Sequence, residues 1–200
     1  MRNVFILILL AFIISCNSNG KDDIVLEEEK DISYSFVKIE YHAQNNSREF
    51  FFLHVPTITF TNRGNVEQTY SFNPGDSYSD SSCFKSEDDG MYEIGDIELF
   101  VPIYIDENNA ISLGAKKWKY TYETQQQKSS LNFFQSITVP PNSEVIIESK
   151  MFFRKYTVNY KLFLKGNQTG KERIIEGNWM GTFLDYPEIN ISRKTIQNPF

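Results

Sequence analysis

The segment Ile97-Glu98-Leu99-Phe100-Val101-Pro102-Ile103-Tyr104-Ile105 alternates strictly between two kinds of position. Its odd-numbered positions are all aliphatic, whereas its even-numbered positions are a mixture of charged, aromatic and proline residues. Because successive side chains of a strand point to opposite faces, this period of two predicts a β-strand with one apolar face. Asp106-Glu107-Asn108-Asn109 is a turn signal, and Ile111, Leu113 and Ala115 resume the apolar period after it, so the sequence predicts a β-hairpin.

Similar alternation recurs on both sides of this hairpin, and no window shows a sustained helical period. The chain contains 17 Phe and 11 Tyr among many Ile, Val and Thr residues, a mixture that packs well on a pleated surface. We therefore expect an all-β fold, an elongated antiparallel sheet or β-sandwich, in a single domain over residues 32–200. Residues 77–90 are expected to form a loop, and residues 125–130 a loop or one helical turn. Strands are predicted at 32–41, 49–61, 66–72, 97–105, 111–115, 118–122, 133–139, 144–153, 157–164, 173–184 and 188–191.

The N-terminus has the features of an export signal. One charged residue, Arg2, precedes the apolar run Val4–Ile14, which is too short to span a bilayer as a helix. The run ends in Ile13-Ile14-Ser15-Cys16, which resembles the bacterial lipobox, in which the cysteine is acylated after cleavage. We predict a signal peptide at 1–15, lipidation of Cys16, and a flexible tether at 16–31; an ordinary signal peptide that happens to end in cysteine is the alternative.

The predicted anchor places the protein at the outer membrane. Lys21-Asp22-Asp23, close behind Cys16, resembles the surface-export signal of lipoproteins in the Bacteroides and Flavobacterium group. A plain solvated linker explains the same acidic residues equally well. The expected location is therefore the outer membrane, lipid-anchored, with display at the cell surface as one possibility.

The charge balance and the cysteine content exclude several classes of function. The chain carries 20 basic and 26 acidic residues, a net charge of −6, which disfavours binding to nucleic acid. If Cys16 is acylated, Cys83 is the only thiol left, so we expect neither an intramolecular disulfide nor a cysteine-based zinc site. Cys83 itself is expected to be a small, half-buried side chain, with pairing between molecules as the alternative.

Recognisable catalytic chemistry is missing from the sequence. His42 and His54 lie on predicted strands without the spacing of metal-binding histidines, and we expect them to be partly buried structural residues. We find no nucleophile elbow, phosphate-binding loop or dinucleotide fingerprint, so the protein is not expected to be an enzyme or to need a cofactor. Residues 87–89 are acidic and, with Asp76 and Asp80, form either a calcium site or a solvated acidic loop.

Three blocks of sequence carry a resemblance to a known family. They are Gln135-Ser136-Ile137-Thr138-Val139-Pro140-Pro141-Asn142-Ser143, then Gly177-Asn178-Trp179-Met180-Gly181, and upstream the stretch from Phe60 to Phe72. Together they resemble the aerolysin-like family of pore-forming proteins, which includes the clostridial epsilon toxin and the mosquitocidal toxins. In that family a strand ending in two prolines, here Pro140 and Pro141, precedes paired strands and a turn that matches Gly177, Trp179 and Gly181.

The resemblance implies a mechanism for the hairpin described above. Family members release an amphipathic hairpin and assemble many copies into a transmembrane β-barrel, whose strands need about 9–11 residues. Pairing about Asn108 would place Ile105 by Ile111, Ile103 by Leu113 and Val101 by Ala115, with Leu99 and Ile97 beside Lys117 and Lys119 at the base. The candidate membrane-inserting residues are Ile97, Leu99, Val101, Ile103, Ile105, Ile111, Leu113 and Ala115.

Two functions stay open at this point. Pro102 in mid-strand, the bulky Trp118, Tyr120 and Tyr122 in the return strand, and a lipid anchor all depart from the family pattern. Residues 97–105 would then be a core strand of a stable body, and the protein a lipoprotein that binds a glycan or another protein. Otherwise it is a membrane-anchored homo-oligomer whose partner is a target-cell membrane.

Overall fold

The computed structural model describes residues 31–44, 47–86 and 93–196, which lie within one compact unit and contain strands and no helix. The signal peptide, Cys16, nearly all of the tether and the acidic residues 87–89 lie outside the described residues. The strands are β1 (Ser33–His42), β2 (Arg48–Asn62), β3 (Gln68–Phe72), β4 (Ser79–Ser86), β5 (Glu93–Ile94), β6 (Glu98–Ile105), β7 (Ile111–Lys119), β8 (Gln125–Lys128), β9 (Gln135–Val139), β10 (Ser143–Gly166) and β11 (Glu172–Thr195).

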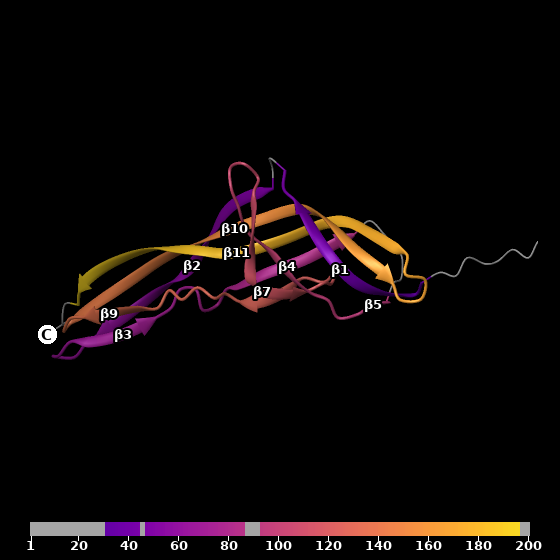
Figure 1. Cartoon of the computed structure of the whole chain (residues 1–200). Coiled ribbons are helices and arrows are strands. Elements are labelled where there is room, and N and C mark those ends of the chain that lie inside the picture. The colour runs from indigo at the N-terminus through magenta and orange to yellow at the C-terminus, as the bar shows by residue number, and fades with distance from the viewer. Residues whose placement is uncertain (1–30, 45–46, 87–92, 197–200) are drawn as a thin grey trace, which may run out of the picture. The chain divides into compact units, whose positions relative to one another are not determined.

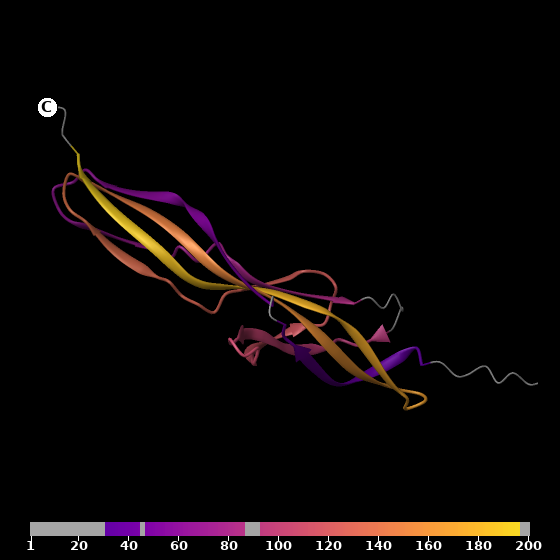
Figure 2. The same ribbon diagram turned by 90° about the horizontal axis from the view of Figure 1, so that it is seen from above.

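Two very long strands, β10 and β11, form the axis of the main sheet (Figure 1). Each has 24 residues, which at about 3.3 Å per residue gives a ladder about 80 Å long. The strand order is β5-β1-β10-β11-β4-β8, and β2 takes the place of β1 beside the first half of β10. Figure 2 shows β1 and β2 at opposite ends of this strand pair. All pairs are antiparallel except β1 with β5, so the expected antiparallel all-β class is confirmed.

Two small sheets pack on this long one. The pair β3–β9 covers the half that contains β2, through a cluster of Phe72, Ile137, Val139, Val145 and Ile147. The hairpin β6–β7 covers the other half, through the largest cluster of buried side chains. Its members come from the hairpin and from β4, β10 and β11: Phe84, Ile97, Leu99, Val101, Ile105, Trp118, Tyr156, Val158, Tyr160, Leu162, Leu164, Ile175, Trp179 and Phe183.

Several predicted elements differ from the structure in instructive ways. The interruptions expected near residue 155 and residue 186 are absent, because one ladder runs through them with a single register shift at Phe152. Residues 77–90 were expected to form a loop, but β4 occupies 79–86, where Asp80, Ser82 and Phe84 are buried. Residues 125–128 are strand β8, paired with β4, and not a loop or helical turn. The register of β1 shifts between Phe36 and Lys38, which marks a β-bulge in this strand.

The Gly177–Gly181 motif is strand and not a turn, which corrects the expectation drawn from the family pattern. It lies in the middle of β11, paired with β4 on one side and β10 on the other. Trp179 is fully buried, and its indole nitrogen donates a hydrogen bond of 2.8 Å to the Ser82 hydroxyl. A Cβ atom at Gly181 would lie 2.3 Å from the Trp179 ring, so the glycine makes room for that ring.

Candidate functional site: a hairpin held against the sheet by side chains

The hairpin β6–β7 is a two-stranded sheet of its own among the described strands. Its turn is ordered by Asp106, whose side chain accepts hydrogen bonds from the backbone N–H groups of Asn108 at 2.9 Å and Ala110 at 2.7 Å. Asn109 has a φ of 63°, a left-handed conformation that asparagine tolerates better than most residues. The turn predicted from the sequence is therefore confirmed, and it pairs Ile105 with Ile111 as expected.

The pairs predicted for Ile103, Leu99 and Ile97 are wrong, and Leu113 faces Pro102 and not Ile103. Leu99 faces Trp118 and not Lys117, and Lys119 faces Glu98 and not Ile97. Two register shifts flank Pro102, which has no N–H group to donate to the ladder. Together the two shifts leave β7 one residue longer than β6, which brings Trp118 and not Lys117 beside Leu99. Trp118 is 2 % exposed there, and a large aromatic side chain gains far more from burial than a lysine would.

The candidate insertion residues therefore do not form one continuous face. Ile97, Leu99, Val101 and Ile105 are buried against the main sheet, and Ile111 packs at the margin of the same cluster. Ile103, Leu113 and Ala115 are exposed, and they lie where the register shifts around Pro102. In this conformation the apolar stripe of β6 is part of the core.

Hydrogen bonds from side chains hold the edges of the hairpin to the body. The Tyr41 hydroxyl donates to the carbonyl of Phe100 at 3.0 Å, and Arg48 donates to the carbonyl of Ile105 at 3.3 Å. On the other edge, Gln125 and Gln127 of β8 reach β7 in the same way, and we call this pair the glutamine clasp. The amide of Gln125 donates to the carbonyl of Lys119 at 2.6 Å and accepts from its N–H at 3.2 Å.

The second residue of the glutamine clasp extends this contact along β7. Gln127 donates to the carbonyl of Lys117 at 3.1 Å, while the ammonium of Lys116 donates to the carbonyl of Lys128 at 2.8 Å. These bonds satisfy polar groups of an edge strand without fusing it into the main sheet. The clasp could not be predicted from the sequence, because a run of glutamines carries no periodic signal. The pairing of β8 with β4 is what places these side chains beside β7.

The base of the hairpin is fixed by a group of tyrosines. The hydroxyls of Tyr120, just after β7, and Tyr160, in β10, share a hydrogen bond of 2.9 Å. Burial raises the pKa of Tyr160 to about 12 and raises the pKa of Tyr120 further. Both hydroxyls are therefore neutral at physiological pH, and they tether the end of β7 without a charge.

A cavity of about 350 Å³ lies between the middle of the hairpin and the body. Ile103, Gly114 and Trp118 line it from the hairpin, and Phe183 and Leu184 line it from β11. The hairpin and the body do not pack on each other across this open pocket, so the hairpin is held less tightly here than a filled interface would hold it.

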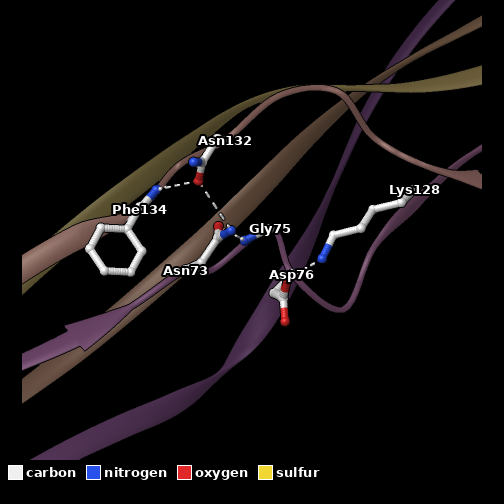
Figure 3. Close-up of polar contacts among 6 residues, drawn as sticks. All are labelled: Asn73, Gly75, Asp76, Lys128, Asn132 and Phe134. Carbon is white, nitrogen blue, oxygen red and sulfur yellow. Dashed lines mark hydrogen bonds and ion pairs between the residues drawn. The ribbon is translucent and has the colours of Figure 1, made fainter.

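The segment that leads from β8 to β9 is fixed by the polar network drawn in Figure 3. Asn132 accepts hydrogen bonds from the Phe134 N–H at 3.1 Å and from the Asn73 amide at 3.4 Å. Lys128, the last residue of β8, forms an ion pair of 2.7 Å with Asp76. This network ties the far end of β8 to the β3–β4 turn and so positions the glutamine clasp.

The carboxylates proposed for calcium face different partners. Asp76 pairs with Lys128, whereas Asp80 is buried and accepts the backbone N–H of Leu184 at 3.0 Å. Across residues 31–44, 47–86 and 93–196, no group of three or more His, Cys, Asp or Glu side chains converges as metal ligands would. His42 and His54 are exposed, which corrects the expectation that they would be partly buried.

Cys83 is buried, and its thiol lies 3.3 Å from the carbonyl oxygen of Tyr122. Pro140 and Pro141 lie where the resemblance placed them, in the turn between β9 and β10, and the carbonyl of Pro140 accepts the Ser143 hydroxyl at 2.6 Å. In the part of the chain that the structure describes, no helix is long and apolar enough to span a bilayer.

Asp80, which lines the cavity under the hairpin, is expected to give a specific pH dependence. Burial raises the pKa of its carboxyl, while the Leu184 N–H and the charge of Lys116 oppose that shift. A raised folded-state pKa means that the folded protein loses stability as pH rises from the unfolded to the folded value. Asp80→Asn keeps an acceptor for the Leu184 N–H but has no carboxyl group to ionise. Its free energy of unfolding should therefore increase relative to that of wild type as the pH rises through this window. Denaturant titrations at several pH values measure that difference, and a pH-independent difference would contradict the assignment.

Comparison with solved structures defines the class of the described body, an all-β protein of aerolysin-like fold. The crystal structure of the lamprey immune protein, an aerolysin-like protein, matches with a TM-score of 0.55 and 12 % identity, over 83 % of this chain and 55 % of that chain. The chain therefore spans just over half the length of the lamprey protein. At this identity the match establishes the fold alone.

Two further structures match less well. Parasporin-2, a Bacillus thuringiensis toxin that recognizes cancer cells, gives a TM-score of 0.44 at 11 % identity, over 80 % of this chain and 74 % of the toxin. An aerolysin-like protein of Bombina maxima gives 0.40 at 8 % identity, over 81 % and 98 %. No family model matches the sequence, and no curated protein matches it either.

Proposed function

We propose that this protein is a lipid-anchored, non-enzymatic pore former, exported to the outer membrane and held there through Cys16. In this proposal several copies assemble, each releases the β6–β7 hairpin, and the hairpins close into a β-barrel across a target membrane. The observation that carries the proposal is the way the hairpin is attached. Side chains of Tyr41, Arg48 and the glutamine clasp hold its edges.

Attachment by side chains keeps the free-energy cost of releasing the hairpin low. The hairpin is a separate two-stranded sheet, so its release breaks no strand pairing of the main sheet. Exposing the buried faces of Leu99, Val101, Ile105 and Trp118 to water costs about 1.5–3 kcal/mol each, but lipid hydrocarbon restores that burial. The pair from Ile97 to Tyr120, closed by a backbone bond of 2.8 Å, gives strands near the length that a bilayer needs.

The proposal is tested by locking the hairpin to β8. In the double variant Lys117→Cys/Gln127→Cys, a cleavable bismaleimide should bridge β7 and β8, because Gln127 already bonds to the carbonyl of Lys117. Leakage of dye from vesicles of phosphatidylcholine, and of phosphatidylethanolamine with phosphatidylglycerol, should stop in the bridged protein and return when the bridge is reduced. The unbridged double variant is the matched control.

Two results would count against insertion. One is an unmodified protein that causes no leakage from either type of vesicle at any concentration that can be reached. The other is a bridged protein that causes leakage at the rate of the unbridged control, since its hairpin cannot leave the body.

A further inference from the structure

The outer face of β2, β10 and β11 carries an ordered grid of side chains that the hairpin does not use. The register places Phe52, Phe152 and Tyr186 in one row across the three strands. The next row is His54, Lys150 and Glu188, and beyond it Glu148 faces Asn190. An aromatic row therefore lies directly beside rows of hydrogen-bonding side chains.

A hollow opens in the polar rows at an irregularity of β2. The β2–β10 register shifts between Ile147 and Ser149, so that Pro56 and Thr57 have no partner in the ladder. Such bulges redirect side chains and open the sheet locally. The hollow here measures about 280 Å³ and is lined by His54, Val55, Thr57, Glu148, Ser149, Lys150 and Asn190.

The aromatic row is exposed to solvent although its rings contact one another. Phe52 is 47 % exposed and Tyr186 is 50 % exposed. The rings of Phe152 and Tyr186 stack with centroids 4.6 Å apart, and Phe52 lies 5.5 Å from Phe152. This row is a firm apolar shelf, because three side chains from three strands support each other.

The hydrogen-bonding groups and the charge of the hollow favour a neutral sugar over an anionic ligand. Lys150 and the Asn190 amide can donate into the hollow, while Glu148 and the amide oxygen can accept. Glu188 lies beside the hollow and pairs with Lys150 at 3.5 Å, so these three charged groups sum to −1. Because a net negative site repels phosphate and anionic headgroups, lipid and nucleic-acid ligands are disfavoured. Sugar hydroxyls both donate and accept, and a pyranose ring presents a face of C–H groups that suits an aromatic side chain.

We propose that this hollow and its aromatic shelf bind a neutral oligosaccharide. One sugar ring lies on Phe52, beside Tyr186, and the hydroxyls of the next enter the hollow to meet Glu148, Lys150 and Asn190. The site lies on the half of the main sheet that contains β2, whereas the hairpin packs on the half that contains β1. Sugar binding is thus independent of the hairpin, and it would give the protein a means of selecting a surface.

The test uses the full-length protein on a printed array of neutral oligosaccharides of two to six hexoses, followed by titration of the strongest binder. Phe52→Ala and Glu148→Gln should each weaken binding about 10-fold, since one removes the stacking surface and the other a charged acceptor. Phe134→Ala removes an aromatic residue that is 60 % exposed elsewhere and should bind as wild type. Thermal melts of all variants confirm that each is folded.

Each other outcome overturns the proposal. If the wild-type protein binds no oligosaccharide on the array, it lacks the proposed site. If Phe52→Ala and Glu148→Gln both bind as tightly as wild type, the sugar binds elsewhere on the protein. A protein that binds phosphatidylcholine vesicles through Phe52 but binds no sugar uses this face for lipid instead. Because the array contains no membrane and the vesicles used for leakage contain no sugar, this test and the pore test fail separately.

Discussion

Leakage should disappear, and the monomer should lose about 3–5 kcal/mol of unfolding free energy, when Val101 is replaced by lysine. Val101 is fully buried in the cluster between β6 and the main sheet, so Val101→Lys places an unpaired charge there. For a chain of this size that corresponds to a fall of about 10 °C in Tm. In a barrel the same lysine would face lipid near the midplane, at a further cost of about 2–4 kcal/mol per copy.

The matched control for Val101→Lys is Tyr104→Lys. Tyr104 is in the same strand but 49 % exposed on the opposite side of the hairpin. In the proposed barrel that side faces the aqueous lumen, so Tyr104→Lys should melt close to wild type, keep leakage and shift ion selectivity toward anions. Leakage is measured well below the Tm of the Val101→Lys variant, so that the variants are compared in the folded state. If Tyr104→Lys abolishes leakage without lowering Tm, the assignment of faces is wrong.

The hairpin shows which features of the structure could be predicted from the sequence and which could not. The period of two in Ile97–Ile105 and the turn signal at Asp106 are local features, and they correctly predicted a strand and a turn, although Ile103 does not share the buried face. The register is not a local feature, because it depends on which side chain, Lys117 or Trp118, gains more free energy from burial beside Leu99. That space is created by β10 and β11, which lie far along the chain, so the position of the shifts around Pro102 could not be derived from the hairpin alone.

Strands β4 and β8 were missed for a related reason. Ser79–Ser86 is rich in small polar residues, which by composition favour a loop. In the structure its hydroxyl and carboxyl groups are satisfied by β11, as in the bonds from Trp179 to Ser82 and from Leu184 to Asp80. Gln125–Lys128 then becomes a strand by pairing with β4. Long-range partners decide both elements, and neither carries an apolar period of its own.

The two surfaces proposed for function also depend on register between distant strands. Phe52, Phe152 and Tyr186 belong to segments separated by up to 134 positions, and only the ladders of β10 align them. The glutamine clasp similarly joins β7 to a strand paired with β4. Sequence pattern therefore predicted the class of fold and the presence of the hairpin, while the contacts that hold the hairpin came from topology.

Replacing Cys16 with serine should move the protein from the membrane fraction to the soluble fraction almost completely. In the proposal, acyl chains on Cys16 provide the anchorage, and two or more chains are needed because one gives only marginal, reversible binding. Serine is close in size but has no thiol to accept a lipid. The residues that follow Cys16 are mainly polar and charged, so they offer little apolar surface to keep the variant at the membrane.

The measurement combines metabolic labelling with a radioactive or clickable fatty acid and fractionation of the cells. Cys83→Ser serves as the matched control, because it removes the other cysteine, which is buried in the body, and should stay labelled and membrane-bound. Cys16→Ser should be unlabelled and soluble. If it remains in the membrane fraction without label, a different part of the chain holds the protein there, and the lipoprotein assignment must be abandoned.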